Sequence, residues 1–157
     1  MHDNAAGISI LDKNLFELHA RANKDLAQFD FGENCYDVNF IRNVNDADLK
    51  DLIKAISNAG GIWGQSNNEP IIYVTGIRFS KDEVQIMGKN QDTVKIEKNG
   101  IAYMKFFAKE LIKELEDAPD DLVINVIGRA NLNEWMGRVT PQIFIDDYEI
   151  LDERLEF

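Results

Sequence analysis

The segment from Asn133 to Asp147, NEWMGRVTPQIFIDD, places a tryptophan and an arginine close to a single glycine. A tryptophan ring can stack on a nucleic-acid base, and an arginine can pair with a phosphate. Trp135 also has a structural alternative, because a tryptophan at a hairpin tip can fold back and cap the open end of a small barrel. The sequence leaves both roles open for Trp135. It predicts a positive φ for Gly137 in the turn.

The residues on both sides of this turn alternate as strands do, and one face is apolar. That core face carries Leu122, Ile124, Val126, Gly128, Ala130 and Leu132, and then Val139, Pro141, Ile143 and Ile145. The opposite face gathers cations, amides and one aromatic ring: Arg129, Asn131, Asn133, Arg138, Thr140, Gln142 and Phe144. This mixture suits a single nucleic-acid strand, on which stacking contributes about 1–3 kcal/mol per base. A solvated outer face, with Phe144 under a helix or a neighbouring domain, is the alternative.

The part of the chain after Pro70 is predicted to be mostly short strands. They cover 71–79, 84–88, 93–98, 101–107, 122–132 and 138–150, with an Asn99-Gly100 hairpin turn and one helix over 108–117. If 84–88 and 93–98 form one bent strand, five strands result, with the helix between the third and the fourth. That order predicts an α+β fold built on a five-stranded OB-fold, a Greek-key barrel whose strands two and three and loop four-five bind ligands.

Strands two and three of this barrel supply further groove residues. They are Gln85, Met87, Lys89, Lys95, Tyr103 and Lys105. Their side of the sheet depends on a bulge that the stretch GKNQD could hold. We expect a partly basic groove on an acidic body.

The part of the chain before Pro70 alternates helix and strand. Apolar spacing predicts a helix over 12–29 and a strand over 36–41. A second helix is predicted to begin with Asn45 as its N-cap and to stop at Gly60-Gly61. The residues that follow, rich in Gly, Ser and Asn, predict a domain junction.

Composition narrows the class of protein. The chain has 157 residues, a net charge of −11 and 45% hydrophobic residues, which indicates a folded protein and argues against a sequence-independent duplex binder. Cys35 is the only cysteine, so neither an internal disulfide nor a thiolate metal cluster is expected. The sequence has no apolar run long enough for a membrane span, and a cytoplasmic protein without a membrane partner is expected.

Motifs of catalysis are missing from the sequence. The two histidines are His2 and His19, and neither belongs to a triad, a zinc spacing, a P-loop or a nucleophile elbow. We therefore expect no catalytic residue and no metal site in this chain.

Three stretches together resemble the C-terminal part of the RecJ family, single-strand-specific DNA exonucleases of the DHH phosphoesterase superfamily. HDNAAG, His2 to Gly7, resembles the end of the glycine-glycine-histidine motif in the DHH-associated domain. IWGQSNNEP, Ile62 to Pro70, is similar to the junction into the OB domain, and NLNEWMGRVTPQIFIDDYEI is similar to the closing hairpin, N-x-W-x-G-R…P-Q-x-x-I-x-D. The glycines expected before His2 are missing, and the junction departs from the usual pattern at 65–68.

The resemblance implies three parts: a remnant of the DHH-associated α/β domain over 1–61, a junction over 62–69 and the OB domain over 70–157. It implies a fragment of a 5′–3′ exonuclease of DNA repair and recombination, inactive alone, whose missing N-terminal DHH domain holds Mn²⁺ or Mg²⁺. The OB domain would bind single-stranded DNA weakly, without sequence preference, and guide it to that domain. The implied DNA contacts are Trp135, Arg138, Arg129, Gln142, Phe144, Lys89, Tyr103 and Lys105, with His2 on a phosphate.

Two alternatives remain open at this point. The acidic surface could dock a protein partner, such as the catalytic domain of the parent protein. The second alternative is that the chain is a free-standing OB domain that binds oligosaccharides.

Overall fold

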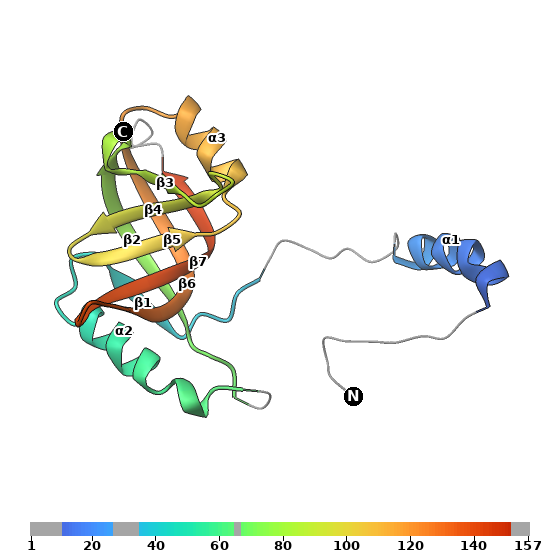
Figure 1. Ribbon diagram of the computed structural model, residues 1–157, viewed down its shortest axis with the longest axis horizontal. Coiled ribbons are helices and arrows are strands. Elements are labelled where there is room, and N and C mark those ends of the chain that lie inside the picture. The colour runs from blue at the N-terminus through green and yellow to red at the C-terminus, as the bar shows by residue number, and fades with distance from the viewer. Residues whose placement is uncertain (1–10, 27–34, 65–66, 152–157) are drawn as a thin grey trace. The chain divides into compact units, whose positions relative to one another are not determined.

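The computed structural model describes residues 11–26, 35–64 and 67–151 (Figure 1). By its internal contacts the chain divides into two units, Met1–Cys35 and Tyr36–Phe157. The described part of the first unit holds a 3₁₀ turn, η1 (Asp12–Asn14), and helix α1 (Leu15–Leu26), where a helix was predicted. On α1, Arg21 and Glu17 form an ion pair one helical turn apart, at 2.6 Å.

The second unit is built around one long hairpin, β6 (Asp121–Trp135) with β7 (Arg138–Leu151). Trp135 lies directly opposite Arg138, and Met136 and Gly137 form the turn with φ of 48° and 76°. Two consecutive positive φ values are the mark of a type I′ turn, whose twist matches that of paired strands. The predicted positive φ at Gly137 is confirmed, and Met136 shares it.

Five other strands complete the sheet: β1 (Phe40–Asn43), β2 (Ile71–Ser80), β3 (Gln85–Met87), β4 (Thr93–Lys98) and β5 (Ile101–Lys105). Their order is β1-β2-β6-β7-β5-β4-β3, with β5 parallel to β7. Within it, β2, β4, β5, β6 and β7 are compatible with the five strands of the predicted OB-fold. The prediction of one bent strand is wrong in detail, because β3 and β4 pair antiparallel as two strands.

Two bulges bend these strands. In β2 the pairing with β6 shifts between Val74 and Ile77, and Gly76 takes φ of 75°. Its amide donates to Oδ1 of the buried Asn125 at 2.9 Å, so the bulge leaves no unpaired donor there. In the β6–β7 pair, Asp146 is the extra residue, between the pairs Ile127–Asp147 and Gly128–Ile145.

Two helices accompany the sheet at opposite ends of the barrel, α2 (Leu49–Asn58) at the bottom and α3 (Lys109–Asp117) at the top of Figure 1. Their buried stripes, Leu49, Ile53 and Ile56 on α2 and Leu111 and Leu115 on α3, join one core with the strands. A short 3₁₀ turn, η2 (Gly60–Ile62), follows α2. None of the helices in the described ranges is long and apolar enough to cross a membrane.

The predicted N-cap of α2 is wrong. The helix starts three residues later than Asn45 allows, after Asp48, whose side chain makes no capping bond. Asn45 serves another purpose, because its Oδ1 accepts a hydrogen bond from Nδ2 of Asn99, in the β4–β5 turn, at 3.1 Å. The turn residues Asn99 and Gly100 have φ of 53° and 70°, which confirms the predicted hairpin.

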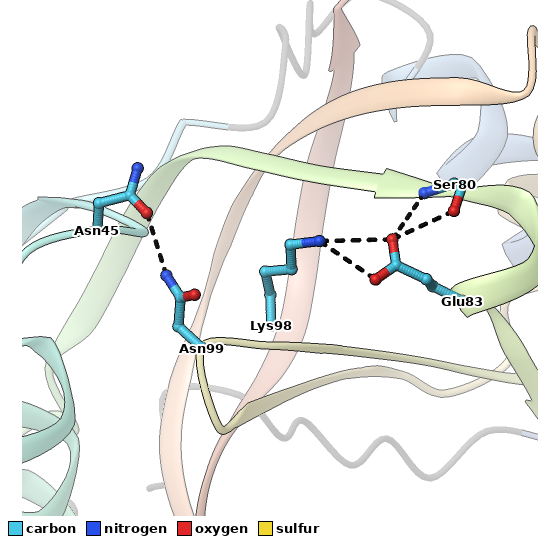
Figure 2. A network of polar contacts seen from close by, with 5 residues as sticks. All are labelled: Asn45, Ser80, Glu83, Lys98 and Asn99. Atoms are coloured by element: carbon cyan, nitrogen blue, oxygen red, sulfur yellow. Dashed lines mark hydrogen bonds and ion pairs between the residues drawn. The ribbon is translucent and has the colours of Figure 1, made fainter.

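Side chains bridge the junction between β2 and β4, two strands that contact each other but share no ladder in the described sheet. Figure 2 shows the bridges. Lys98 at the end of β4 pairs with Glu83 at 3.2 Å. Glu83 also accepts from the amide of Ser80 at 2.9 Å, in a capping box of the turn η3 (Lys81–Glu83).

The predicted domain limits at 61 and 70 stay a prediction. In the structure β1 pairs in parallel with β2, and α2 contacts β6 and β7. These contacts place residues 40–58 in the same unit as the sheet that follows them.

Gly128 is the position where a side chain would damage the hairpin most directly. A Cβ there would lie 2.3 Å from the backbone oxygen of Phe144 and 2.8 Å from Cγ2 of Ile143. Gly128→Ala should therefore lower the free energy of unfolding by at least about 1–3 kcal/mol, the usual cost of overpacking. Urea denaturation followed by circular dichroism measures the change.

Gly60→Ala is the control, because a Cβ at Gly60 meets no atom within 4 Å. It should change the free energy of unfolding by less than about 0.5 kcal/mol, as most unconstrained surface substitutions do. Equal stability of the two variants would contradict the close approach at Gly128.

Candidate functional site

A groove of about 230 Å³ lies on the polar face of the β6–β7 hairpin, beside its turn. We call it the hairpin groove. Strands β4 and β5 contribute to it together with the hairpin itself, since β5 neighbours β7 and β4 neighbours β5. Its lining residues are Lys95, Glu97, Ala102, Asn133, Trp135, Arg138, Thr140 and Gln142.

Pairing of β6 with β7 explains why these side chains meet. Trp135 lies opposite Arg138, Asn133 opposite Thr140, and Asn131 opposite Gln142. Successive pairs on one face of a strand are about 6.5–7 Å apart. The face therefore carries regular rows of aromatic, cationic and amide groups, as the alternation predicted.

Trp135 projects into solvent, with 69% of its surface exposed. A tryptophan that capped the barrel would be covered by the core, so the structure does not have the capping arrangement. The ring instead lines the hairpin groove together with Arg138. An exposed indole has a free face for a planar ligand.

The cations of the groove differ in their partners. Nζ of Lys95 pairs with Oε2 of Glu97 at 3.1 Å, across one face of β4. Arg138 is exposed, and no residue in the described ranges forms an ion pair or hydrogen bond with its guanidinium. Arg138 is therefore the groove cation that is ready to bind an anion.

Arg129 lies one row beyond Gln142, the hairpin residue of the groove that is farthest from the turn, and is bound to Asp146. Its Nε donates to Oδ2 at 3.0 Å and its Nη2 donates to Oδ1 at 2.7 Å, a bidentate pair. This hydrogen bonding to Asp146 raises the pKa of Arg129. The bulge explains the pair, because the extra residue Asp146 lies beside the row of Arg129 and Phe144.

Gln142 and Phe144 are held by neighbours on β5 and after it. Gln142 is only 7% exposed, and its Nε2 donates to Sδ of Met104 at 3.5 Å. The Phe144 ring meets Phe106 edge to face, with ring centres 5.3 Å apart at 73°. Phe144 is thus half-buried, and its ring partner is the exposed Phe106.

Two of the predicted groove residues are on the wrong side of the sheet. Tyr103 is fully buried in the core, and burial raises the pKa of its hydroxyl. Lys105 follows the same alternation; its Nζ donates to the backbone oxygen of Asp146 and lies 5.9 Å from the ring centre of Tyr148. The predictions that Tyr103 and Lys105 line the groove are wrong, because Ala102 and Met104 are the residues of β5 on the groove side, although Ala102 is only 1% exposed.

Neither of the predicted contacts Lys89 and His2 is found in the hairpin groove of the described residues. Lys89 is exposed in the turn between β3 and β4 and does not line the hairpin groove. His2 lies outside the described residues, so its proposed phosphate contact stays a prediction. Of the remaining predicted contacts, Trp135, Arg138 and Gln142 come together in the groove, whereas Arg129 and Phe144 do not line it.

The sequence interpretation missed four residues of this face: Glu97, Ala102, Met104 and Phe106. The signal was present in the Asn99-Gly100 turn, because a two-residue turn sets Lys98 opposite Ile101 and Ile96 opposite Tyr103. Tyr103 then shares the core side of Ile96. Its neighbours in the chain must face outward.

The described side chains of His, Cys, Asp and Glu lie mostly apart from one another. In the described ranges, no three of these side chains come together in a way that could hold a metal ion.

Comparison with known proteins gives matches in sequence and in structure. The family model described as the RecJ OB domain matches residues 43–147. YorK of Bacillus subtilis (strain 168), whose name describes a putative SPbeta prophage-derived single-strand DNA-specific exonuclease, is 32% identical over 152 residues, covering 96% of this chain and 26% of its own. Its counterpart in Bacillus phage SPbeta gives the same values. The chain thus spans about a quarter of the length of these curated relatives.

Two solved structures share the fold. RecJ from Thermus thermophilus, in complex with Mn²⁺, superimposes with a TM-score of 0.61 at 15% identity, covering 91% of this chain and 20% of that one. The complex with Mg²⁺ gives a TM-score of 0.59 at 14% identity and covers 89% and 21%. These likenesses confirm the mixed α/β fold class.

The buried hydroxyl of Tyr103 yields a test of its placement. Its Oη has no hydrogen-bond partner among the described residues, and an unsatisfied buried polar group costs about 1–3 kcal/mol. Tyr103→Phe should therefore raise the free energy of unfolding by about 1 kcal/mol in urea denaturation. It should leave any ligand affinity of the hairpin groove unchanged.

Tyr103→Ala is the matched control and should lower the free energy of unfolding by about 3–5 kcal/mol, as loss of a buried ring does. A stable fold after Tyr103→Ala would show that the ring is exposed. If a folded Tyr103→Phe variant lost ligand binding, the placement of Tyr103 in the core and outside the groove would be wrong.

Proposed function

The chain belongs to the RecJ OB domain family, and from this membership we propose that it binds single-stranded DNA in the hairpin groove, weakly and without sequence preference. The observation that carries the proposal is the facing pair of an exposed tryptophan and an arginine without an ion-pair partner in the described ranges, Trp135 and Arg138. Single-strand binders of this kind combine stacking rings with cations that follow the backbone.

Sequence-independent binding fits the groups present in the groove. A base of any kind has a π-face for the Trp135 ring, and a phosphate of any nucleotide can pair with Arg138. The amides of Asn131, Asn133 and Gln142 can donate to and accept from base edges, but Gln142 is already engaged with Met104. Weak binding follows because Glu97 and Asp146 offset the charges of Lys95 and Arg129.

The wider role we propose is that of a guide in a 5′–3′ exonuclease of DNA repair and recombination. The OB domain would hold the single strand and lead it to a DHH domain, outside the sequence of this chain, that holds Mn²⁺ or Mg²⁺. The name of YorK describes a single-strand DNA-specific exonuclease, which supports this role. Hydrolysis is proposed to need the DHH domain, so this chain alone would be inactive.

The acidic charge favours a second candidate function. A net charge of −11 suits a module that docks a protein partner, such as the catalytic domain, and DNA contacts would then be incidental. A pull-down that yields a stoichiometric protein partner, with no effect of DNA on tryptophan fluorescence, would favour this function over the first.

Titration of labelled oligo-dT at low salt, followed by fluorescence anisotropy, tests DNA binding. Trp135→Ala should weaken binding by about 1–3 kcal/mol, the usual value of one stacked base. Arg138→Ala should also weaken it and lower the slope of log affinity against log salt by about one unit, because one phosphate contact is lost.

Lys113→Ala, which removes an exposed cation on α3, is the control and should leave both quantities unchanged. Absence of binding at millimolar protein, or an equal loss in all three variants, would overturn the proposal.

Asp146 provides a test in the opposite direction. Asp146→Asn removes a carboxylate from the DNA face and releases the Arg129 guanidinium from its bidentate pair. Affinity for oligo-dT should therefore increase several-fold at low salt, and the gain should shrink as salt screens the new charge. The control is Asp51→Asn on α2, which makes the same change of charge and releases Lys54 from an ion pair but does not touch the lining of the hairpin groove. Weaker binding by Asp146→Asn would mean that the ion pair itself shapes the site.

A further inference from the structure

An aromatic pair lies on the same strand face as the hairpin groove, three rows farther from the turn. The rows are Trp135–Arg138, Asn133–Thr140, Asn131–Gln142 and Arg129–Phe144. In the last row Phe144 meets Phe106 edge to face and has Met104 beside it on β5. We call Phe106 and Phe144 the second platform.

The described residues cover the second platform only in part, and Phe144 is half-buried. Phe106 is 45% exposed although it follows a strand whose other aromatic, Tyr103, is fully buried. An edge-to-face pair fixes the two rings relative to each other, and part of the ring surface stays open. A fixed, half-open aromatic surface beside the cation Arg129 has the composition of a stacking site for a base.

Strand geometry fixes the separation of the two aromatic sites. Trp135 and Arg129 are six residues apart on β6, which corresponds to about 20 Å at roughly 3.3 Å per residue. The rows between them carry amides and a hydroxyl, Asn131, Asn133, Thr140 and Gln142, and no large apolar side chain. A strand of DNA lying along the hairpin would thus meet an aromatic group at each end and polar groups between.

We propose that Phe106 and Phe144 stack on a base at one end of a single-stranded DNA track whose other end is at Trp135. The track accommodates about four nucleotides, the lower limit of the roughly 4–16 nucleotides bound per OB-fold. The proposal rests on the proposed function and adds to it a length, a direction along the hairpin and a residue, Phe106, that the sequence pattern did not indicate.

The test compares dT2 with dT6 in the full chain. An oligonucleotide of two residues is too short to reach both sites, whereas dT6 spans them. Phe144→Leu keeps apolar bulk in the row and removes the aromatic face, so it should lower the affinity for dT6 by about 5- to 100-fold. Its effect on dT2, which can bind at Trp135, should stay within about twofold.

Two further variants control for folding and for general loss of aromatic surface. Phe144→Tyr keeps an aromatic face and should bind dT6 as the wild type does. Phe107→Leu removes the neighbouring, 88% exposed ring, which lines a different pocket with Glu110 and Tyr148, and should leave binding unchanged. Phe106→Leu should behave as Phe144→Leu does.

The outcomes separate the two proposals. If Trp135→Ala weakens dT6 while Phe144→Leu and Phe106→Leu bind it like the wild type, the second platform is wrong and the proposed function stands. Equal losses on dT2 and dT6 after Phe144→Leu would also overturn the platform, since they indicate a general disturbance. If the wild type binds neither oligonucleotide, both proposals fail.

Discussion

The pairing of β6 with β7 is the constraint on which the rest of the structure depends. Its register begins at the type I′ turn of Met136 and Gly137 and shifts once, at Asp146. On the core side it aligns Ile124, Val126 and Ala130 with the buried residues of neighbouring strands. On the outer side the same register aligns Trp135 with Arg138 and Arg129 with Phe144. A slip by one residue would exchange the two faces, so stability and binding surface are specified together.

Sequence patterns predicted much of this arrangement because the controlling signals are local. Alternation in β6 and β7 and the Asn99-Gly100 turn are visible over a few residues, and they led to the strand order and to the face of Trp135. The prediction for Tyr103 is wrong because it depends on a possible bulge in GKNQD, a stretch that forms the turn of the β3–β4 hairpin. The pairing of Arg129 with Asp146 was not predictable, since it needs the bulge that the partner strand imposes. The late start of α2 likewise reflects a distant contact, between Asn45 and Asn99.

Local and overall charge need not agree in this molecule. The chain has a net charge of −11, yet the outer face of the hairpin and of β4, which follows β5 in the sheet, holds the cations Lys95, Arg129 and Arg138. Carboxylates of Glu97 and Asp146 neutralise two of them at short range. A surface of this kind adds little long-range attraction, so the affinity it provides depends on ring contacts and on one arginine. That balance is consistent with the weak single-strand binding proposed for the hairpin groove.

The junction between β2 and β4 is where the described sheet can open without breaking a backbone ladder. Backbone ladders hold every other described neighbour in the sheet, whereas Lys98, Glu83 and Ser80 join this junction through side chains near the surface. An exposed ion pair adds little to stability, so a partial opening at this junction breaks no backbone ladder and is opposed mainly by the core side chains of β2 and β4. Amide hydrogens beside the junction should exchange with solvent through such partial opening. The barrel can thus loosen at one side while the strands that carry Trp135 and Phe144 remain paired.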